Sequence, residues 1–132
     1  MTETQQNGTG PAASVAMFTI DCADPKPVAE FYSRLLGMTI AYLDDEVALL
    51  SGDTGPAIGF GKVGNYHPPT WPDDNSDKQF HLDLKVDDIP AAEARAVELG
   101  ATVPEQQPGD TWRVLLDPAG HPFCLTRWQM DS

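Results

Sequence analysis

An internal repeat restricts the fold of this chain more than any other feature of its sequence. Residues 17–40 align with residues 81–103 when one residue is deleted. Each copy has the same order: an alternating polar and apolar segment, an aspartate, an amphipathic helical segment, a Leu-Gly pair and a second strand-like segment. The sequence therefore predicts two copies of one structural unit rather than one irregular domain.

Each copy is predicted to begin with a strand that leads into a helix. Polar and apolar residues alternate over residues 17–22 and 81–86, a period of two that is typical of a strand with two different faces. An aspartate before each helix is placed as its N-cap, and a glycine after it stands where a left-handed residue ends a helix. These residues are Asp24 and Gly37 in the first copy and Asp88 and Gly100 in the second.

Three further strand candidates follow the helix in each copy. They cover residues 39–43, 47–50 and 57–63 in the first copy, and residues 102–105, 112–116 and 123–128 in the second. Clusters of Asp, Gly and Pro separate them, as expected for turns. Each copy is thus predicted as a β-α-β-β-β module, which makes the fold class α+β.

We expect one domain over residues 14–128, with the modules at 14–63 and 79–128. The segment 64–78 between them is rich in proline and is predicted to be an irregular linker. Residues 1–13 are polar, lack the pattern of a signal peptide, and are predicted to be a disordered tail.

The charge of the chain narrows the classes of partner. The formal net charge is −12 at pH 7, and such a field repels phosphate backbones and anionic lipids. No apolar run approaches the roughly 20 residues that a membrane-spanning helix needs. We therefore expect neither nucleic acid nor membrane as a partner, and a cytoplasmic location. The acidity favours cationic ligands, although it is also explained by solubility alone.

The two faces of the first strand in each module differ. The helix of each module must cover an apolar face, which carries Phe18 and Ile20 in the first copy and Leu82 and Leu84 in the second. The opposite face is polar, and buried polar groups need partners. It is therefore either solvated or part of a ligand cavity between the two modules, and we favour the cavity. Its residues are Met17, Thr19 and Asp21, and His81, Asp83 and Lys85.

The chain resembles the vicinal oxygen chelate superfamily, which contains the glyoxalases, the bleomycin resistance proteins and a class of dioxygenases. Two segments, around Trp71-Pro72-Asp73 and His81-Leu82-Asp83, are most similar to a glyoxalase-like subgroup. The resemblance implies paired modules that form a U-shaped mixed sheet around a cavity, commonly in homodimers. The other motifs that carry it are Asp24-Pro25, Phe31-Tyr32, Leu35-Leu36-Gly37, Leu99-Gly100-Ala101 and Asp117-Pro118-Ala119-Gly120-His121-Pro122-Phe123.

Metal-using members of the superfamily take four ligands from corresponding strands, and the resemblance assigns these positions to Met17, Gly59 (or Gly61), His81 and Cys124. His81 is a usual ligand, whereas a glycine offers no side chain and a methionine suits soft ions such as copper(I). One His and one Cys fall short of the three protein ligands of most catalytic zinc sites. We therefore expect no bound cofactor, with a divalent metal at His81 as the alternative.

The remaining candidates for ligand binding are Trp71, Arg113, Cys124 and Trp128. Trp71 lies between prolines in the linker, where its ring either stacks on a planar ligand or packs across the module junction. Arg113 either holds a ligand carboxylate or forms a surface ion pair. Cys124 is expected in the cavity, and both it and Cys22 are expected as free thiols. His121 is interpreted as a structural residue of its turn.

Two functional hypotheses follow. The first is a small-molecule-binding protein that sequesters an aromatic or cationic compound or an antibiotic, as the drug-resistance members of the superfamily do. The alternative is a lyase, isomerase or dioxygenase-type enzyme in which His81 acts as general base and Asp83 or Asp21 orients it, with or without a divalent metal.

Overall fold

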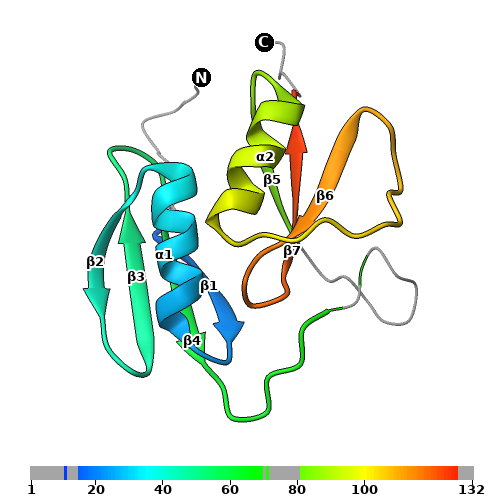
Figure 1. Cartoon of the computed structure of the whole chain (residues 1–132). Helices are drawn as coiled ribbons and strands as arrows, with labels where there is room; N and C mark the ends of the chain where they lie inside the picture. Colours follow the sequence, from blue (N-terminus) through cyan, green and yellow to red (C-terminus); the bar gives the residue numbers. More distant parts are fainter. Residues whose placement is uncertain (1–10, 12–14, 70, 72–80, 128–132) are drawn as a thin grey trace.

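Figure 1 shows the computed structural model, which describes residues 11, 15–69, 71 and 81–127. Each module has a first strand followed by a helix, as the repeat predicts. Three strands follow the helix in the first module and two in the second. The first module contains β1 (Met17–Cys22), α1 (Pro25–Leu36), β2 (Thr39–Leu43), β3 (Val47–Ser51) and β4 (Ala57–Lys62). The second contains β5 (Leu82–Lys85), α2 (Ile89–Leu99), β6 (Trp112–Leu116) and β7 (Pro122–Thr126).

Both helices begin and end at the predicted residues. The Asp24 carboxylate accepts a hydrogen bond from the backbone N–H of Lys26, at 3.1 Å, and the Asp88 carboxylate accepts one from Ala91, at 3.0 Å. The last turn of each helix is closed by a glycine with positive φ, 71° at Gly37 and 125° at Gly100. Side-chain caps satisfy backbone donors that the first turn of a helix leaves without a partner.

The repeat extends to the pairing of the strands. The sheet orders are β1-β4-β3-β2 and β5-β7-β6. In both sheets the first strand of the module pairs in parallel with its last strand, and the remaining pairs are antiparallel. The α+β class and the paired modules are therefore confirmed, and the strands belong to two separate sheets.

The strand predicted over residues 102–105 is reduced to one β-bridge, which Thr102 makes to β6. Pro104 lacks an N–H group and cannot continue the ladder. The side chain of Gln107 takes the place of a strand by donating to the Val114 carbonyl, at 3.0 Å, and accepting from the Val114 N–H, at 2.9 Å. The second module is thus one strand shorter than the first.

Both helices lie on the same side of the molecule, α1 over the first sheet and α2 over the second, and they contact each other (Figure 1). Four aromatic rings form the centre of the core beneath them. The rings of Tyr32 and Phe60 are stacked with centroids 5.6 Å apart, and Phe31 contacts Phe123 of the second module at 5.7 Å. Since Phe123 also packs on Tyr32, the two modules share one hydrophobic core.

The apolar face of β1 is only partly covered. Ile20 is buried, as predicted for a residue under the helix, but Phe18 is 48% exposed. Phe18 lies near the start of β1, which is an edge strand of its sheet. The expectation that Phe18 packs beneath a helix is therefore wrong for most of its side chain.

A buried hydrogen bond joins the modules beside this core. Tyr32 of α1 donates through its hydroxyl to Asp117, at 2.7 Å, and Asp117 is 4% exposed. The backbone N–H groups of Ala119 and His121 donate to the other carboxylate oxygen, at 2.8 and 3.0 Å. Burial raises the pKa of the Asp117 carboxyl above its usual value of 3.8, while the hydrogen bond from Tyr32 acts in the opposite direction.

The linker carries no helix or strand over residues 64–69, in agreement with the prediction. The predicted tail, apart from Pro11, and most of residues 70–78 lie outside the described residues. In the part of the chain that is described, no helix is long and apolar enough to cross a membrane.

We predict that Tyr32→Phe lowers the free energy of unfolding by about 1–3 kcal/mol, because a buried carboxylate loses a donor. The Tyr32 hydroxyl favours the ionised carboxylate, so its removal raises the pKa of Asp117 further. The loss should therefore be larger at pH 7 than near pH 4, because a carboxyl whose pKa is raised further in the folded state costs more stability as the pH rises. Urea unfolding of both proteins at the two pH values measures it.

The matched control is Tyr42→Phe, which removes the hydroxyl of an exposed tyrosine bonded to Asp44. We expect little change in its urea midpoint. A loss for Tyr32→Phe that is equal at both pH values, or larger near pH 4, contradicts the assignment.

Candidate functional site

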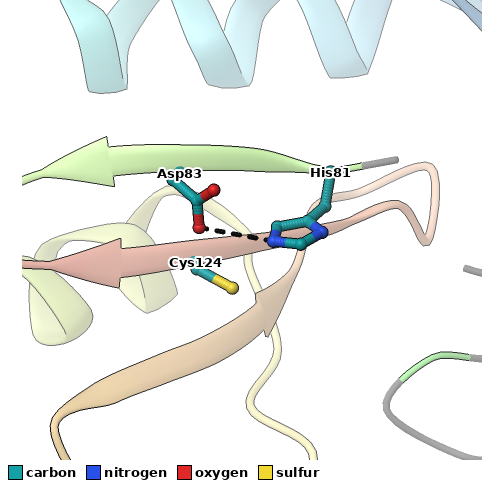
Figure 2. A group of neighbouring side chains, drawn as sticks. All are labelled: His81, Asp83 and Cys124. Carbon is teal, nitrogen blue, oxygen red and sulfur yellow. Dashed lines mark ion pairs between the residues drawn. The ribbon is translucent and has the colours of Figure 1, made fainter. Parts of the chain in front are cut away.

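Three side chains that can bind a ligand or a metal gather on one face of the second sheet (Figure 2). They are His81, Asp83 and Cys124, and one donor atom of each lies within 4.8 Å of the others. His81 Nε2 is 3.3 Å from Asp83 Oδ1. Within the described ranges, this is the one group of three His, Cys, Asp or Glu residues with such spacing.

Strand geometry brings the three together. Asp83 of β5 and Cys124 of β7 are direct partners in the parallel register, and neighbouring strands lie about 4.8 Å apart. His81 precedes β5 and is two residues from Asp83, so the two side chains leave the same face. The alternate residues Leu82 and Leu84 pack against the hydrophobic core. The polar face predicted from the alternation of β5 is thus a real feature of the sheet.

Exposure increases across the cluster from the thiol to the carboxylate. Cys124 is 1% exposed, whereas the side chains of His81 and Asp83 are 19% and 59% exposed. A ligand can therefore approach from the side of Asp83 and reach the imidazole without opening the core. The buried thiol forms the floor of this site.

The second cysteine has a different environment, although it too is buried and free, as predicted. Cys22 belongs to the core beneath α1, and its thiol donates to the carbonyl of Gly61 at 3.6 Å. Burial, reinforced by nearby Asp24 and Asp117, raises the pKa of the Cys22 thiol to about 11. Cys22 is therefore protonated at neutral pH and is a poor nucleophile or metal ligand.

Aromatic rings stand beside the cluster. The Trp71 ring stacks on His81 with centroids 4.8 Å apart and an interplanar angle of 21°. It also lies parallel to Trp112, at 6.3 Å and 11°. Because Trp112 pairs with Thr126, two residues after Cys124, it shares the face of the cluster. Trp71 therefore contacts two rings of the second module, and its contact with a ligand stays a prediction.

Trp112 is the neighbour of the site that the sequence-based prediction did not select. The alternation along β6 indicates that Trp112 and Arg113 lie on opposite faces. Only the register of β6 against β7 shows which of the two faces is that of the cluster. Trp128, which we did select, lies outside the described residues.

The first module has no imidazole, carboxylate or thiol at the three positions equivalent to His81, Asp83 and Cys124. Thr19 and Gly59 are partners in the parallel register of β1 and β4, as Asp83 and Cys124 are in the second module. The thioether of Met17 lies over Gly59, 3.1 Å from where a Cβ atom would stand. Met17 itself is 41% exposed. The four-ligand metal set implied by the resemblance therefore does not fit, since Gly59 has no donor and Met17 offers only a thioether.

The alternative register does not supply the missing donor, because Gly61 is also a glycine. Gly61 pairs with Asp21, and a Cβ atom there would be 3.9 Å from the Thr19 methyl group. The Asp21 side chain is on the exposed face of β1. Its backbone carbonyl is within hydrogen-bond distance of His121 Nε2, which also lies 3.0 Å from the Tyr66 hydroxyl. His121 thus links β1, the linker and its own turn, as its structural interpretation requires.

Arg113 lies on the opposite face from the cluster. It pairs in register with Leu125 of the core, and its Nε is 2.8 Å from a carboxylate oxygen of Glu93 on α2. There it lines a separate hollow of about 510 Å³ beside Ile89 and Val97. Of the two interpretations of Arg113, the structure supports the ion pair.

Comparisons with known proteins agree with this architecture. The sequence profile of a family described as "Glyoxalase-like domain" matches residues 17–126. No curated protein is significantly similar to the chain in sequence.

Several solved structures share the fold at low sequence identity. A possible glyoxalase from Bacillus cereus is 16% identical with a TM-score of 0.65, over 87% of this chain and 99% of that one. A glyoxalase/bleomycin resistance protein/dioxygenase family enzyme from Burkholderia phytofirmans is 19% identical with a TM-score of 0.64, over 86% and 97%. The trypanothione-dependent glyoxalase I of Leishmania major is 16% identical with a TM-score of 0.61, over 88% of each chain.

We predict that Trp71→Ala shifts the NMR signals of the His81 ring protons downfield, because protons over the face of a stacked indole are shielded by its ring current. The stack of Trp71 on His81 is the contact that generates this shielding. His121 serves as internal control, since its ring packs on Tyr66 instead. Unchanged His81 signals, or equal shifts at His121, contradict the stack.

Proposed function

Because the chain belongs to the glyoxalase-like domain family of the vicinal oxygen chelate superfamily, we propose that it is a small-molecule-binding protein. Its ligand is a planar aromatic molecule, preferably cationic, held at the polar face of the second sheet. The observation that carries the proposal is the aromatic stack of Trp71 on His81, beside a partly exposed carboxylate.

The aromatic side chains supply the apolar part of the site. Trp71 and Trp112 are both partly exposed, so each retains ring surface for a ligand. Aromatic pairs contribute about 0.5–1.5 kcal/mol beyond the area that they bury. The orientation of Trp71 is set by its contacts with His81 and Trp112, which reduces the entropy that binding must remove.

The charge of the site favours a cation. Asp83 is 59% exposed at the mouth of the cluster, and the whole chain carries a formal charge of −12. A cation is attracted both by this field and by the faces of the tryptophan rings. The same field opposes an anionic ligand of the same shape. Lys85 is a cation on this face, beside Thr126, whereas Arg113 is engaged with Glu93 on the other face.

Binding without turnover is supported by the first module. The equivalents of the second-module donors are Met17, Thr19 and Gly59, which provide neither an acid nor a base. At these equivalent positions only the second module has acid or base groups, which suits retention of a compound better than a two-sided reaction such as proton transfer between adjacent carbons. Sequestration of a toxic compound, including an antibiotic, is the corresponding role.

A second candidate function is favoured by the ion pair between His81 and Asp83, at 3.3 Å. A carboxylate that orients an imidazole and stabilises its protonated form is a common arrangement for a general base. On this alternative, His81 removes a proton from a substrate stacked on Trp71, and Asp83 is the positioning residue. Turnover that is lost in His81→Ala would identify it.

The test is a thermal-shift panel of planar aromatic cations with neutral and anionic analogues of the same shape. We predict that the cations raise the melting temperature. A ligand at 100 times its Kd stabilises the folded chain by about 2.7 kcal/mol. Trp71→Ala should reduce the shift, because the stacking surface is lost.

Tyr42→Ala is the matched control, since Tyr42 is a 49% exposed aromatic residue on β2 of the other sheet. It should leave the shift unchanged. Preferential binding of the anionic analogues, or equal effects of the two variants, overturns the proposal. Repeated conversion of a bound compound, followed by chromatography, would instead establish the second candidate.

A further inference from the structure

We propose that the second module alone forms a site for one divalent ion of the zinc class, with His81, Asp83 and Cys124 as ligands. Such a site differs from the four-ligand arrangement implied by the superfamily, which draws on both modules and does not fit this chain. It goes beyond the proposed function, because binding of the ion does not require an organic ligand.

The strand registers show that the donors are concentrated in one module. Asp83 pairs with Cys124 at the position where Thr19 pairs with Gly59 in the first module. His81 precedes Asp83 by two residues, as Met17 precedes Thr19. At three equivalent positions, the second module therefore has an imidazole, a carboxylate and a thiol. The first module has a thioether, a hydroxyl and a glycine without a side chain.

The spacing of the donors suits a tetrahedral ion. Two ligand atoms, each about 2.0–2.1 Å from zinc, lie about 3.3 Å apart at the tetrahedral angle. His81 Nε2 and Asp83 Oδ1 are separated by 3.3 Å. All three donor atoms fall within 4.8 Å of one another, which places the Cys124 sulfur beside this pair as the third ligand.

The chemistry of the donors selects the class of ion. One nitrogen, one oxygen and one sulfur ligand favour zinc or cobalt(II) over magnesium and calcium, which prefer oxygen ligands throughout. Three protein ligands leave a fourth position open for water or another small ligand. Asp83, at 59% exposure, lies on the solvent side of this site.

Trp71 supports the geometry from outside the ligand set. Its ring covers His81 at 4.8 Å and restricts rotation of the imidazole. Residues around the ligands commonly orient them in this way. By contrast, Cys22 is equally buried but lies among core residues under α1, with the Gly61 carbonyl as its partner, and it is a suitable control.

The experiment is titration of the full chain, reduced and freed of metal, with Co²⁺ and then Zn²⁺. We expect one Co²⁺ per chain, the intense visible absorption of tetrahedral cobalt and a near-ultraviolet charge-transfer band from the thiolate. Zn²⁺ should displace Co²⁺ and abolish both signals. Cys124→Ser should remove the charge-transfer band, and Cys22→Ser should retain it.

Asp83→Asn keeps the proposal testable if substitution of the buried Cys124 prevents folding, because Asp83 is exposed. It should weaken Zn²⁺ binding at least about tenfold, the smaller end of the loss seen when groups around a metal are changed. Asp21→Asn, an exposed aspartate on the equivalent face of β1, should have no effect. Folding of each variant is checked by far-ultraviolet circular dichroism.

A weak octahedral cobalt spectrum without the thiolate band overturns the proposal, as does equal Zn²⁺ affinity in Asp83→Asn and Asp21→Asn. The thermal-shift panel on the metal-free chain keeps the two proposals separate. Aromatic cations that bind there support the proposed function even if the metal site fails, and metal binding without any organic ligand supports only the metal site.

Discussion

The parallel pairing of the first and last strands in each module is the constraint on which the rest of the structure depends. A parallel pair cannot be joined by a tight turn, so the chain must cross over, and in each module a helix provides the first part of that crossover. The helix then covers one face of the sheet and leaves the other available for a site. The same pairing sets Asp83 directly beside Cys124.

The repeat, the two helices and most strands could be predicted because their signals are local. Period-two alternation, an aspartate cap and a terminal glycine specify an element without reference to the rest of the chain. The prediction of a strand at residues 102–105 is wrong, because the side chain of Gln107 forms the hydrogen bonds to β6 in its place. Pro104 is a local signal against a strand, but no local pattern indicates that a side chain bonds to β6 instead.

The site could be predicted only in part, for a related reason. His81 and Asp83 were recognisable from one segment of sequence. Their proximity to Cys124 and Trp112 depends on the register of β5 with β7, where Asp83 pairs with a residue 41 positions later, and on the register of β6 with β7. The sequence allowed two roles for Arg113. In the structure its side chain lies on the face of β6 toward α2, where it forms an ion pair with Glu93. The first module has the same fold, but the thioether of Met17 lies over Gly59. Binding chemistry therefore resides in one half of a symmetric framework.

The second module alone supplies the imidazole, carboxylate and thiol of the proposed ion site. An anomalous-difference map from crystals grown with Zn²⁺, recorded on both sides of the zinc absorption edge, tests it most directly. We expect one peak within bonding distance of His81 Nε2, an Asp83 carboxylate oxygen and Cys124 Sγ. A peak shared between Met17 and His81, or no peak at the cluster, would contradict it.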